Sequence, residues 1–288
     1  MRKSLSSIAV LCGLVLVAQM AYAAPVEVTG VEFLPGKSIK IPMTAQNVAP
    51  QASIEADVLF KHGQSRVKIM YRDMKPAILF GGDVTSYVVW AVTYDGRAAN
   101  LGELQARKSS GTETFYVGLK GFALVVTAEP YYMVARPSEL VMFVGGGPKK
   151  DKSRSRSYSF SELARAPEHA EMSIADLVWD SKTDLGLLQA RKAFELAQRH
   201  NTGAYANEAL AMAGSELEAA EAIAADRPGS SKIDNPARNA VQLSNTAINI
   251  AVRAEAALAF GEIMMEQERK VKAANERSET LEFMAASL

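Results

Sequence analysis

The feature that most constrains the fold is a change in the spacing of apolar residues near residue 150. Before it, short runs of β-branched and aromatic residues alternate with polar ones, and turns containing Gly, Pro or Asp separate the runs. After it, alanine, glutamate and leucine dominate, and apolar residues recur at spacings of three and four. A period of two indicates strands and a period near 3.6 indicates helices. The chain should therefore form a β domain followed by a helical one.

The first half predicts an antiparallel β domain of six to eight short strands. Turn residues bound each apolar run, and the His62-Gly63 and Asp95-Gly96 dipeptides are typical of hairpins. The expected strands cover residues 53–60, 66–73, 85–93, 99–104, 112–119, 122–129 and 139–144. This number and spacing favour an immunoglobulin- or fibronectin-III-like antiparallel β-sandwich over residues 51–144. A small barrel is the main alternative.

The strand expected at residues 85–93 is apolar on both faces. Alternation places Trp90 with Val88 and Val92 on one face and leaves Tyr87 and Val89 on the other. A strand with two apolar faces is covered on both sides. We therefore expect a central strand on which Trp90 fills the core between the sheets and does not stack on a ligand.

The second half predicts helices at residues 184–200, at 204–225 and from Pro236 onward. Their apolar stripes are Leu187, Ala190, Phe194 and Ala197; Ala206, Leu210, Ala213, Leu217, Ala220 and Ala224; and Ala240, Leu243, Ala247, Ile250, Ala254, Ala257, Gly261 and Met264. Three such stripes with short connections predict an antiparallel three-helix bundle over residues 176–265.

The third helix should protrude from this bundle. If it continues from Pro236 to about Phe283, it is roughly 70 Å long at 1.5 Å per residue. Residues 266–288 are mostly polar, and Glu266 with Lys270 forms an i,i+4 pair, so this part should be an exposed helical tail. Such a length suits a strut or a stalk through which the chain forms a homodimer.

The N-terminus has the pattern of a secretory signal peptide. Arg2 and Lys3 precede an apolar run from Ile8 to Ala18, and small residues surround a cleavage position after Ala23. We expect residues 1–23 to be removed, residues 24–50 to form an extended segment and the protein to be exported. The apolar run is about half the roughly 20 residues of a spanning helix, and no transmembrane span is expected in the mature chain.

Residues 145–175 read as a basic linker rich in Gly, Pro and Ser. Its positive side chains could contact an anionic polymer of the envelope or lipid head groups. These residues are Lys149, Lys150, Lys152, Arg154 and Arg156. The mature chain as a whole has a balanced charge, because removal of the leader takes away two of the 32 basic side chains and none of the 32 acidic ones. We therefore expect no binding to nucleic acid.

No pattern of catalytic residues stands out, and we expect a protein without enzymatic activity or cofactor. The single cysteine, Cys12, lies in the leader, so thiol catalysis and disulfides are excluded from the mature chain. The histidines, His62, His169 and His200, lack the spacing of metal ligands. Asp176, Asp180 and Asp184 could form an acidic face, but a solvated helix start explains them better.

A carbohydrate-binding or carbohydrate-active module is the alternative from another class. It would use carboxylates of the β domain such as Asp57, Asp73 and Asp83. A retaining glycosidase needs two carboxyl groups about 5 Å apart in a cleft. Nothing in the sequence indicates such a cleft.

Two segments of the β domain carry recognisable motifs, SYVVWAVTYDGRAANLGEL and FALVVTAEPYYMVARPSELVMF. The motif residues are Tyr87, Val88, Trp90, Ala91, Asp95, Gly96, Arg97, Asn100–Leu104, Thr127–Pro130 and Pro137-Ser138. They resemble the N-terminal region of OmpA-family bacterial envelope proteins. Residues 190–222, with Tyr205 after a helix break, are similar to the alanine-rich domain that often follows in that family. The resemblance implies a β-sandwich joined to a helical domain.

Members of that family usually continue into a C-terminal OmpA-like domain that holds peptidoglycan. The signature NxxLSxxRAxxV of that domain is absent here, so no peptidoglycan-binding residue carries over. We therefore expect a periplasmic or outer-membrane-associated protein that acts as a binding or spacer module. Its partners would be envelope proteins or peptidoglycan, and a self-associating helical stalk is a further alternative.

Overall fold

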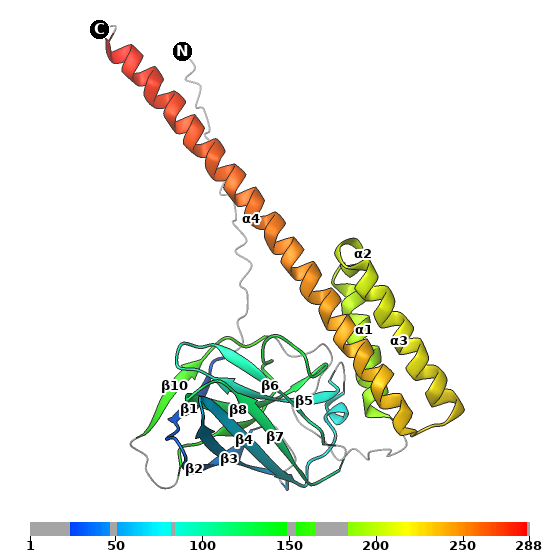
Figure 1. Ribbon diagram of the computed structural model, residues 1–288. Coiled ribbons are helices and arrows are strands. Elements are labelled where there is room, and N and C mark those ends of the chain that lie inside the picture. Colours follow the sequence, from blue (N-terminus) through cyan, green and yellow to red (C-terminus); the bar gives the residue numbers. More distant parts are fainter. Residues whose placement is uncertain are drawn as a thin grey trace, which may run out of the picture.

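The computed structural model describes residues 24–46, 51–81, 84–106, 108–148, 154–164 and 184–286. A β domain lies beside a body of helices, and one helix, α4, continues far beyond both (Figure 1). The predicted order of a β domain followed by helices is confirmed.

Within the described residues, the β domain is an antiparallel sheet of ten strands. The strands are β1 (Val26–Glu32), β2 (Ser38–Ala45), β3 (Ser53–Lys61), β4 (Gln64–Arg72), β5 (Ser86–Val92), β6 (Ala98–Leu104), β7 (Gly111–Val117), β8 (Gly121–Glu129), β9 (Val141–Gly145) and β10 (Ser155–Phe160), with a 3-10 turn η1 (Ala77–Phe80) before β5. The hydrogen-bonded order is β10-β1-β8-β9-β2-β3-β4-β7, and β5 joins β8 to β6.

The sheet nearly closes into a barrel, which corrects the predicted β-sandwich in favour of its alternative. The strands form one connected network because β2 spans both halves. Its residues Ser38–Pro42 pair with β3, and Met43–Ala45 pair with β9. At the other end of the path β6 lies against β7. A sandwich would need two separate sheets, whereas β2 carries the chain from one half into the other.

The β domain extends beyond its predicted limits of residues 51–144. The segment 24–50, expected to be extended and outside the domain, supplies β1 and β2. The expected linker 145–175 supplies β10, which pairs with β1 from Val26↔Phe160 to Val31↔Ser155. Because β10 is a mostly polar edge strand, SRSYSF, it lacks the apolar alternation by which a strand is identified in sequence.

Two apolar cores cover the two faces of β5. Tyr87 and Val89 point into the barrel, among side chains such as Leu124 and Met142. Trp90 points outward into a second core, which β10 and the segment after β8 close with Phe160 and other side chains. The prediction that Trp90 is a core residue is confirmed, since it is fully buried. It packs on the outside of the barrel and does not lie between two sheets.

Both predicted hairpin turns are present. His62 and Gly63 have φ of 53° and 77° and join β3 to β4 as a two-residue turn with both residues left-handed. Between β5 and β6, Gly96 has φ of 80°, and the Thr93 N–H donates to the Arg97 carbonyl at 2.9 Å. Both dipeptides therefore act as turns.

The helical body consists of α1 (Leu185–Arg199), α2 (Thr202–Tyr205), α3 (Asn207–Asp226), the turn η3 (Ser231–Ile233) and α4 (Asp234–Ala286). The predicted stripes of the first two helices are confirmed, with Phe194, Leu210 and Ala224 partly buried and the others buried. Alanine dominates these contacts: Ala190, Ala193, Ala197, Ala213, Ala220, Ala240 and Ala247 are fully buried. Small side chains let helices approach closely.

The bundle ends earlier along α4 than residue 265, the limit that we had predicted, so that limit is wrong. The buried face of α4 comprises Ala237, Ala240, Val241, Ser244, Ala247, Ile248 and Ala251, which is rotated relative to the predicted stripe. Ile250 is 41% exposed, and Ala257 and Met264 are exposed as well. Within the described residues, no helix combines the length and apolar character that crossing a bilayer requires.

Candidate functional site

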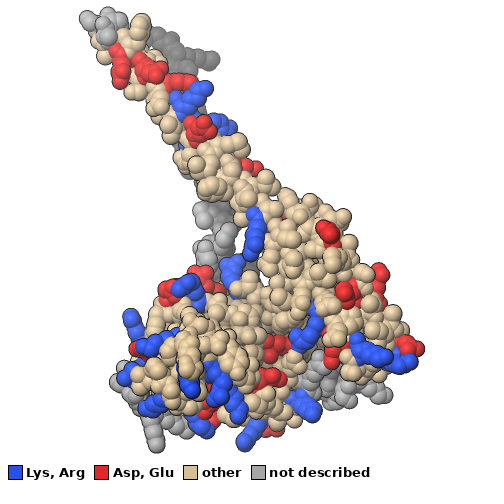
Figure 2. Space-filling view, viewed as in Figure 1, with Lys and Arg blue, Asp and Glu red and all other residues tan. Residues whose placement is uncertain are grey.

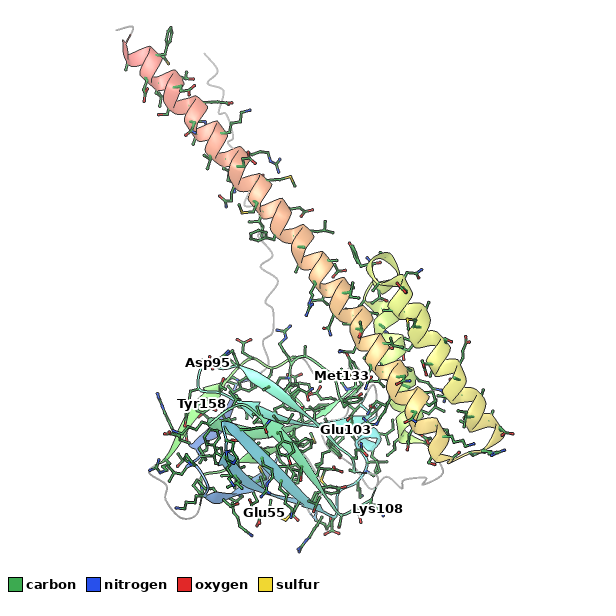
Figure 3. All side chains as sticks on the ribbon, viewed as in Figure 1. Glu55, Asp95, Glu103, Lys108, Met133 and Tyr158 are labelled. Carbon is green, nitrogen blue, oxygen red and sulfur yellow. The ribbon has the colours of Figure 1, made fainter. Side chains whose placement is uncertain are left out.

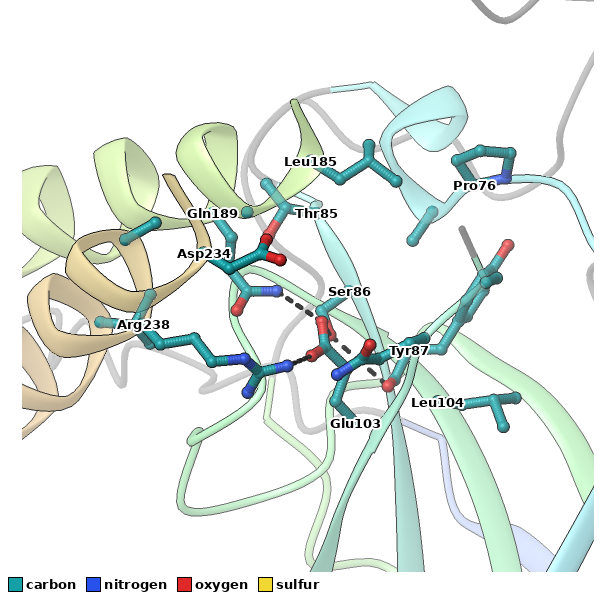
Figure 4. A pocket seen from close by; sticks show the side chains of 16 residues that line it. Pro76, Thr85, Ser86, Tyr87, Glu103, Leu104, Leu185, Gln189, Asp234 and Arg238 are labelled. Atoms are coloured by element: carbon teal, nitrogen blue, oxygen red, sulfur yellow. Dashed lines mark hydrogen bonds and ion pairs between the residues drawn. The ribbon is translucent and has the colours of Figure 1, made fainter. Parts of the chain in front are cut away.

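A polar contact fixes the long helix to the β domain (Figure 4). Glu103 on β6 accepts hydrogen bonds from Gln189 Nε2 on α1 at 2.8 Å and from Ser86 Oγ at 3.1 Å. Its other oxygen, Oε2, lies 3.0 Å from Arg238 Nη2 on α4. One carboxylate thus joins β5, β6, α1 and α4. We call this contact, formed by Ser86, Glu103, Gln189 and Arg238, the brace.

The cavity beside the brace is too small for an organic ligand. Its free volume of about 30 Å³ has room for one or two waters. Polar side chains from both parts of the molecule meet there and satisfy one another. The brace therefore positions the helices and is not a binding pocket.

The segment after β8 forms a second contact between the two parts. Tyr131 OH lies 3.3 Å from Asn245 Oδ1, and the Tyr132 ring packs under the Arg238 guanidinium at 5.2 Å. Asn100 on β6 holds this segment by donating to the carbonyls of Tyr132 and Val134 at 2.9 and 3.0 Å. Met133, in the same segment, lies with Glu103 on the side that faces the helices (Figure 3).

A buried carboxyl group lies under the same segment. Trp90 Nε1 donates to Thr127 Oγ1 at 2.8 Å, Thr127 donates to Glu129 Oε1, and the Ser138 N–H donates to the same oxygen at 2.7 Å. Glu129 is 2% exposed, and burial raises the pKa of its carboxyl group to about 7. The hydrogen bonds from Thr127 and Ser138 lower this pKa but offset only part of the rise. This series of hydrogen bonds links Trp90, Thr127, Glu129 and Ser138, which all belong to the motifs quoted above. These motif positions therefore stabilise the fold.

The predicted basic cluster is not a single site. Lys149, Lys150 and Lys152 lie outside the described residues. Arg156 lies on β10, an ordered strand, and its guanidinium is 6.0 Å from the Tyr94 ring centroid. Arg154 directly precedes that strand. The expectation of a linker is therefore wrong for Ser155–Phe160, which form a strand of the β domain.

The carboxylates of the carbohydrate alternative are not brought together. Asp57 is in the middle of β3 opposite Lys68, while Asp73 follows the end of β4. Five residues of strand separate Asp73 from Lys68, which corresponds to about 16 Å. This exceeds the spacing of either class of glycosidase. Asp83 lies outside the described residues.

The other candidate residues have local roles where the structure describes them. Asp184 caps α1, with Oδ1 accepting from the Leu187 N–H at 2.9 Å, as a helix start requires. His62 is in its hairpin turn, and His200 ends α1. His169, Asp176 and Asp180 lie outside the described residues. Within the described part of the chain, no three His, Asp or Glu side chains gather as metal ligands would.

The largest unexplained surface is the part of α4 beyond the bundle, residues 255–285, which we call the stalk. Every residue in it is exposed apart from Gly261 and Glu266, which are partly exposed. It projects away from the body as a rod on which charged side chains alternate with uncharged ones (Figure 2). Its large exposed apolar side chains are Leu258, Phe260, Ile263, Met264, Met265, Val271, Leu281, Phe283 and Met284.

Sequence reasoning found the stalk but missed the brace and the buried carboxyl. Glu103 and Arg238 are 135 positions apart, and no local pattern connects them. Glu129 did leave a signal, because a carboxylate ends the otherwise apolar strand FALVVTAE. Comparison with known proteins adds no assignment: no protein family, curated protein or solved structure matches this chain.

Proposed function

We propose that this chain is a non-enzymatic, exported protein of the cell envelope that acts as a spacer. The β domain and the helical body form a rigid head, and the stalk holds that head at a distance from a point of attachment. The observation that carries this proposal is the continuity of α4. A single helix, Asp234–Ala286, packs in the body and then continues into solvent.

The direction of the stalk is fixed by contacts at its base. The brace and the Tyr131–Asn245 contact hold α4 against the β domain, while α1 and α3 hold it from another side. From Glu255 to Ala285 the stalk is about 45 Å long at 1.5 Å per residue. A helix of this length without proline transmits its direction from the base, because kinks in helices have specific causes such as proline.

The envelope location rests on the sequence. The leader pattern of residues 1–23 predicts export, and the resemblance to OmpA-family proteins suggests the periplasm or the outer membrane. Expression of the full chain in a Gram-negative host, followed by fractionation and mass spectrometry, tests this. Export predicts a processed chain beginning at Ala24 in the periplasmic or envelope fraction. An unprocessed chain in the cytoplasm would refute it.

The spacer function is tested by a distance measurement between head and stalk. Because the chain has no cysteine after Cys12, spin labels can be attached to cysteines introduced at Arg97 and Glu262. Pulsed electron paramagnetic resonance should give one narrow distance distribution. A labelled pair at Glu255 and Glu276 reports bending of the stalk alone. A broad distribution for the first pair with a narrow one for the second would show a loose joint and contradict the spacer function.

The brace provides a matched variant for this measurement. Arg238→Ala removes the contacts with Glu103 and with the Tyr132 ring but leaves the stalk sequence unchanged. We expect the head-to-stalk distribution to broaden while the distribution within the stalk stays narrow. Unchanged distributions would mean that helix packing alone sets the direction.

A further inference from the structure

We propose that the stalk pairs with the stalk of a second copy of this chain as a parallel, in-register, two-stranded coiled coil. This assignment of a partner rests on the spacer function proposed above and names what the stalk attaches to. It is argued from the pattern of exposed side chains, the position of the bundle and the charges beside the pattern.

One face of the stalk has a continuous heptad pattern without charge. In heptad notation the a positions are Ala257, Met264, Val271, Ser278 and Ala285, and the d positions are Phe260, Gln267, Ala274 and Leu281. Phe260, Val271 and Leu281 are 64%, 59% and 66% exposed, so these apolar side chains have no cover within the described chain. The pattern persists for about four heptads, the length at which a coiled coil becomes a specific interpretation.

The charged side chains of the stalk lie outside this face. Glu262, Glu266, Arg269 and Glu276 occupy the c and f positions, which point away from a partner. Glu266 forms ion pairs with Arg269 at 3.0 Å and with Lys270 at 3.6 Å along its own helix. The a and d positions of the stalk are therefore uncharged, and its charged side chains lie beside and behind them.

The same face is open at the base of the stalk. Continued toward the body, the heptad passes through Thr246, Ile250 and Arg253, all exposed. The side chains that contact α1 and α3, such as Ala247 and Ala251, are on another face. A second α4 can thus approach without displacing the bundle.

The charges at the e and g positions, on either side of the a and d face, favour a second copy of this chain in the parallel direction. The g positions carry Lys270 and Arg277, and the e positions carry Glu268 and Glu282. In a parallel pair, each g side chain faces the e side chain five positions further along the second helix, which places Arg277 opposite Glu282. In an antiparallel pair, g faces g and e faces e, and like charges would meet. Arg277 of each copy therefore meets Glu282 of the other, while Lys270 faces the neutral Asn275, and the parallel direction brings no like charges together.

Sedimentation equilibrium of the mature chain, residues 24–288, tests the association. We expect a concentration-dependent dimer whose dissociation constant rises with salt. Arg277→Glu should weaken the dimer on the order of fivefold, since an attraction becomes a repulsion twice per dimer. The double change Arg277→Glu with Glu282→Arg should restore it. A monomer at the highest soluble concentration, or a double variant no tighter than the single one, would overturn the proposal.

Disulfide trapping tests the direction and the register. Ser278→Cys at an a position would lie opposite its counterpart, within the 4.4–6.8 Å between Cα atoms that a disulfide spans. We expect rapid oxidative cross-linking of this variant. Glu276→Cys, two residues away on the outward face, should remain monomeric on the gel. Equal cross-linking of the Ser278→Cys and Glu276→Cys variants would overturn the parallel pair. So would a mixture of Gln267→Cys and Ser278→Cys chains that cross-links more than Ser278→Cys alone.

The outcome for this pairing can be separated from that for the spacer function. The head-to-stalk distance is intramolecular when labelled chains are diluted with unlabelled ones. A monomer with a narrow distance distribution would refute the coiled coil and leave the spacer function supported. A dimer with a broad distribution would support the coiled coil and refute the spacer function.

Discussion

Replacing Glu129 by glutamine should remove a specific pH dependence of stability. Glu129 is 2% exposed, and burial raises the pKa of its carboxyl group to about 7. In the unfolded chain the same group titrates near 4.5. Between these two values the folded protein holds a proton that the unfolded chain has lost. The substitution keeps an oxygen that can accept from Thr127 and from the Ser138 N–H but cannot titrate.

The sign and size of the effect follow from proton linkage. Because the folded state binds more protons, the free energy of unfolding falls as the pH rises from about 4.5 to about 7. The stability contributed by the proton is complete below this window and lost above it. At about 1.4 kcal/mol per pKa unit, the loss across the window is about 3 kcal/mol. Glu129→Gln should not show this loss.

Urea unfolding followed by tryptophan fluorescence at pH 5 and pH 8 measures this difference. Both chains share all other titrating groups, so the stability of Glu129→Gln minus that of the original chain isolates Glu129. Since pH 5 already lies inside the window, we expect this difference to shift by about 2.5 kcal/mol in favour of the variant on going from pH 5 to pH 8. A difference that stays constant over this range would refute the assignment of a raised pKa to Glu129.

Three further changes test the packing and the stalk. Ala247→Leu, in the fully buried face of α4, should destabilise the body by about 1–3 kcal/mol through overpacking, whereas Ala273→Leu, at an exposed and outward-facing position of the stalk, should leave the thermal unfolding of the body unchanged. Gly261→Ala should stabilise the stalk helix by about 1 kcal/mol, because nothing lies within 4 Å of the added methyl group. Circular dichroism should show that the variant retains more helicity than the original chain as the temperature rises. A double-mutant cycle of Glu103→Gln with Arg238→Met should give a coupling of about 1 kcal/mol in urea unfolding, and a coupling near zero would show that the brace is screened by solvent.

Local patterns predicted the elements well and the closure of the sheet poorly. The His62-Gly63 turn and the start of α1 at Asp184 depend on a few neighbouring residues, and both were predicted correctly. The passage of β2 from β3 to β9 depends on pairing between distant segments. Strand β10 was missed for a related reason, because pairing with β1 alone leaves its outer side polar.

The candidate site divides in the same way. The stalk was predictable because its i,i+4 charges and exposed face are properties of one helix, and the Glu266–Lys270 pair is present at 3.6 Å. Its starting point was misplaced, since only the lengths of α1 and α3 in space decide where α4 loses its neighbours. The brace could not be predicted, because Glu103 meets Arg238 only after the two parts have packed.

The continuity of α4 also determines how the stalk forms and melts. An isolated helix must first nucleate, at a cost of roughly 4 kcal/mol for a nucleation constant near 10⁻³. In this chain the segment from Asp234 to Ala254 is already helical within the bundle and serves as the nucleus. The stalk therefore grows by propagation alone and frays from its free end. In a chain kept monomeric, amide hydrogen exchange should become steadily faster from Glu255 toward Ala285, with no step along the way.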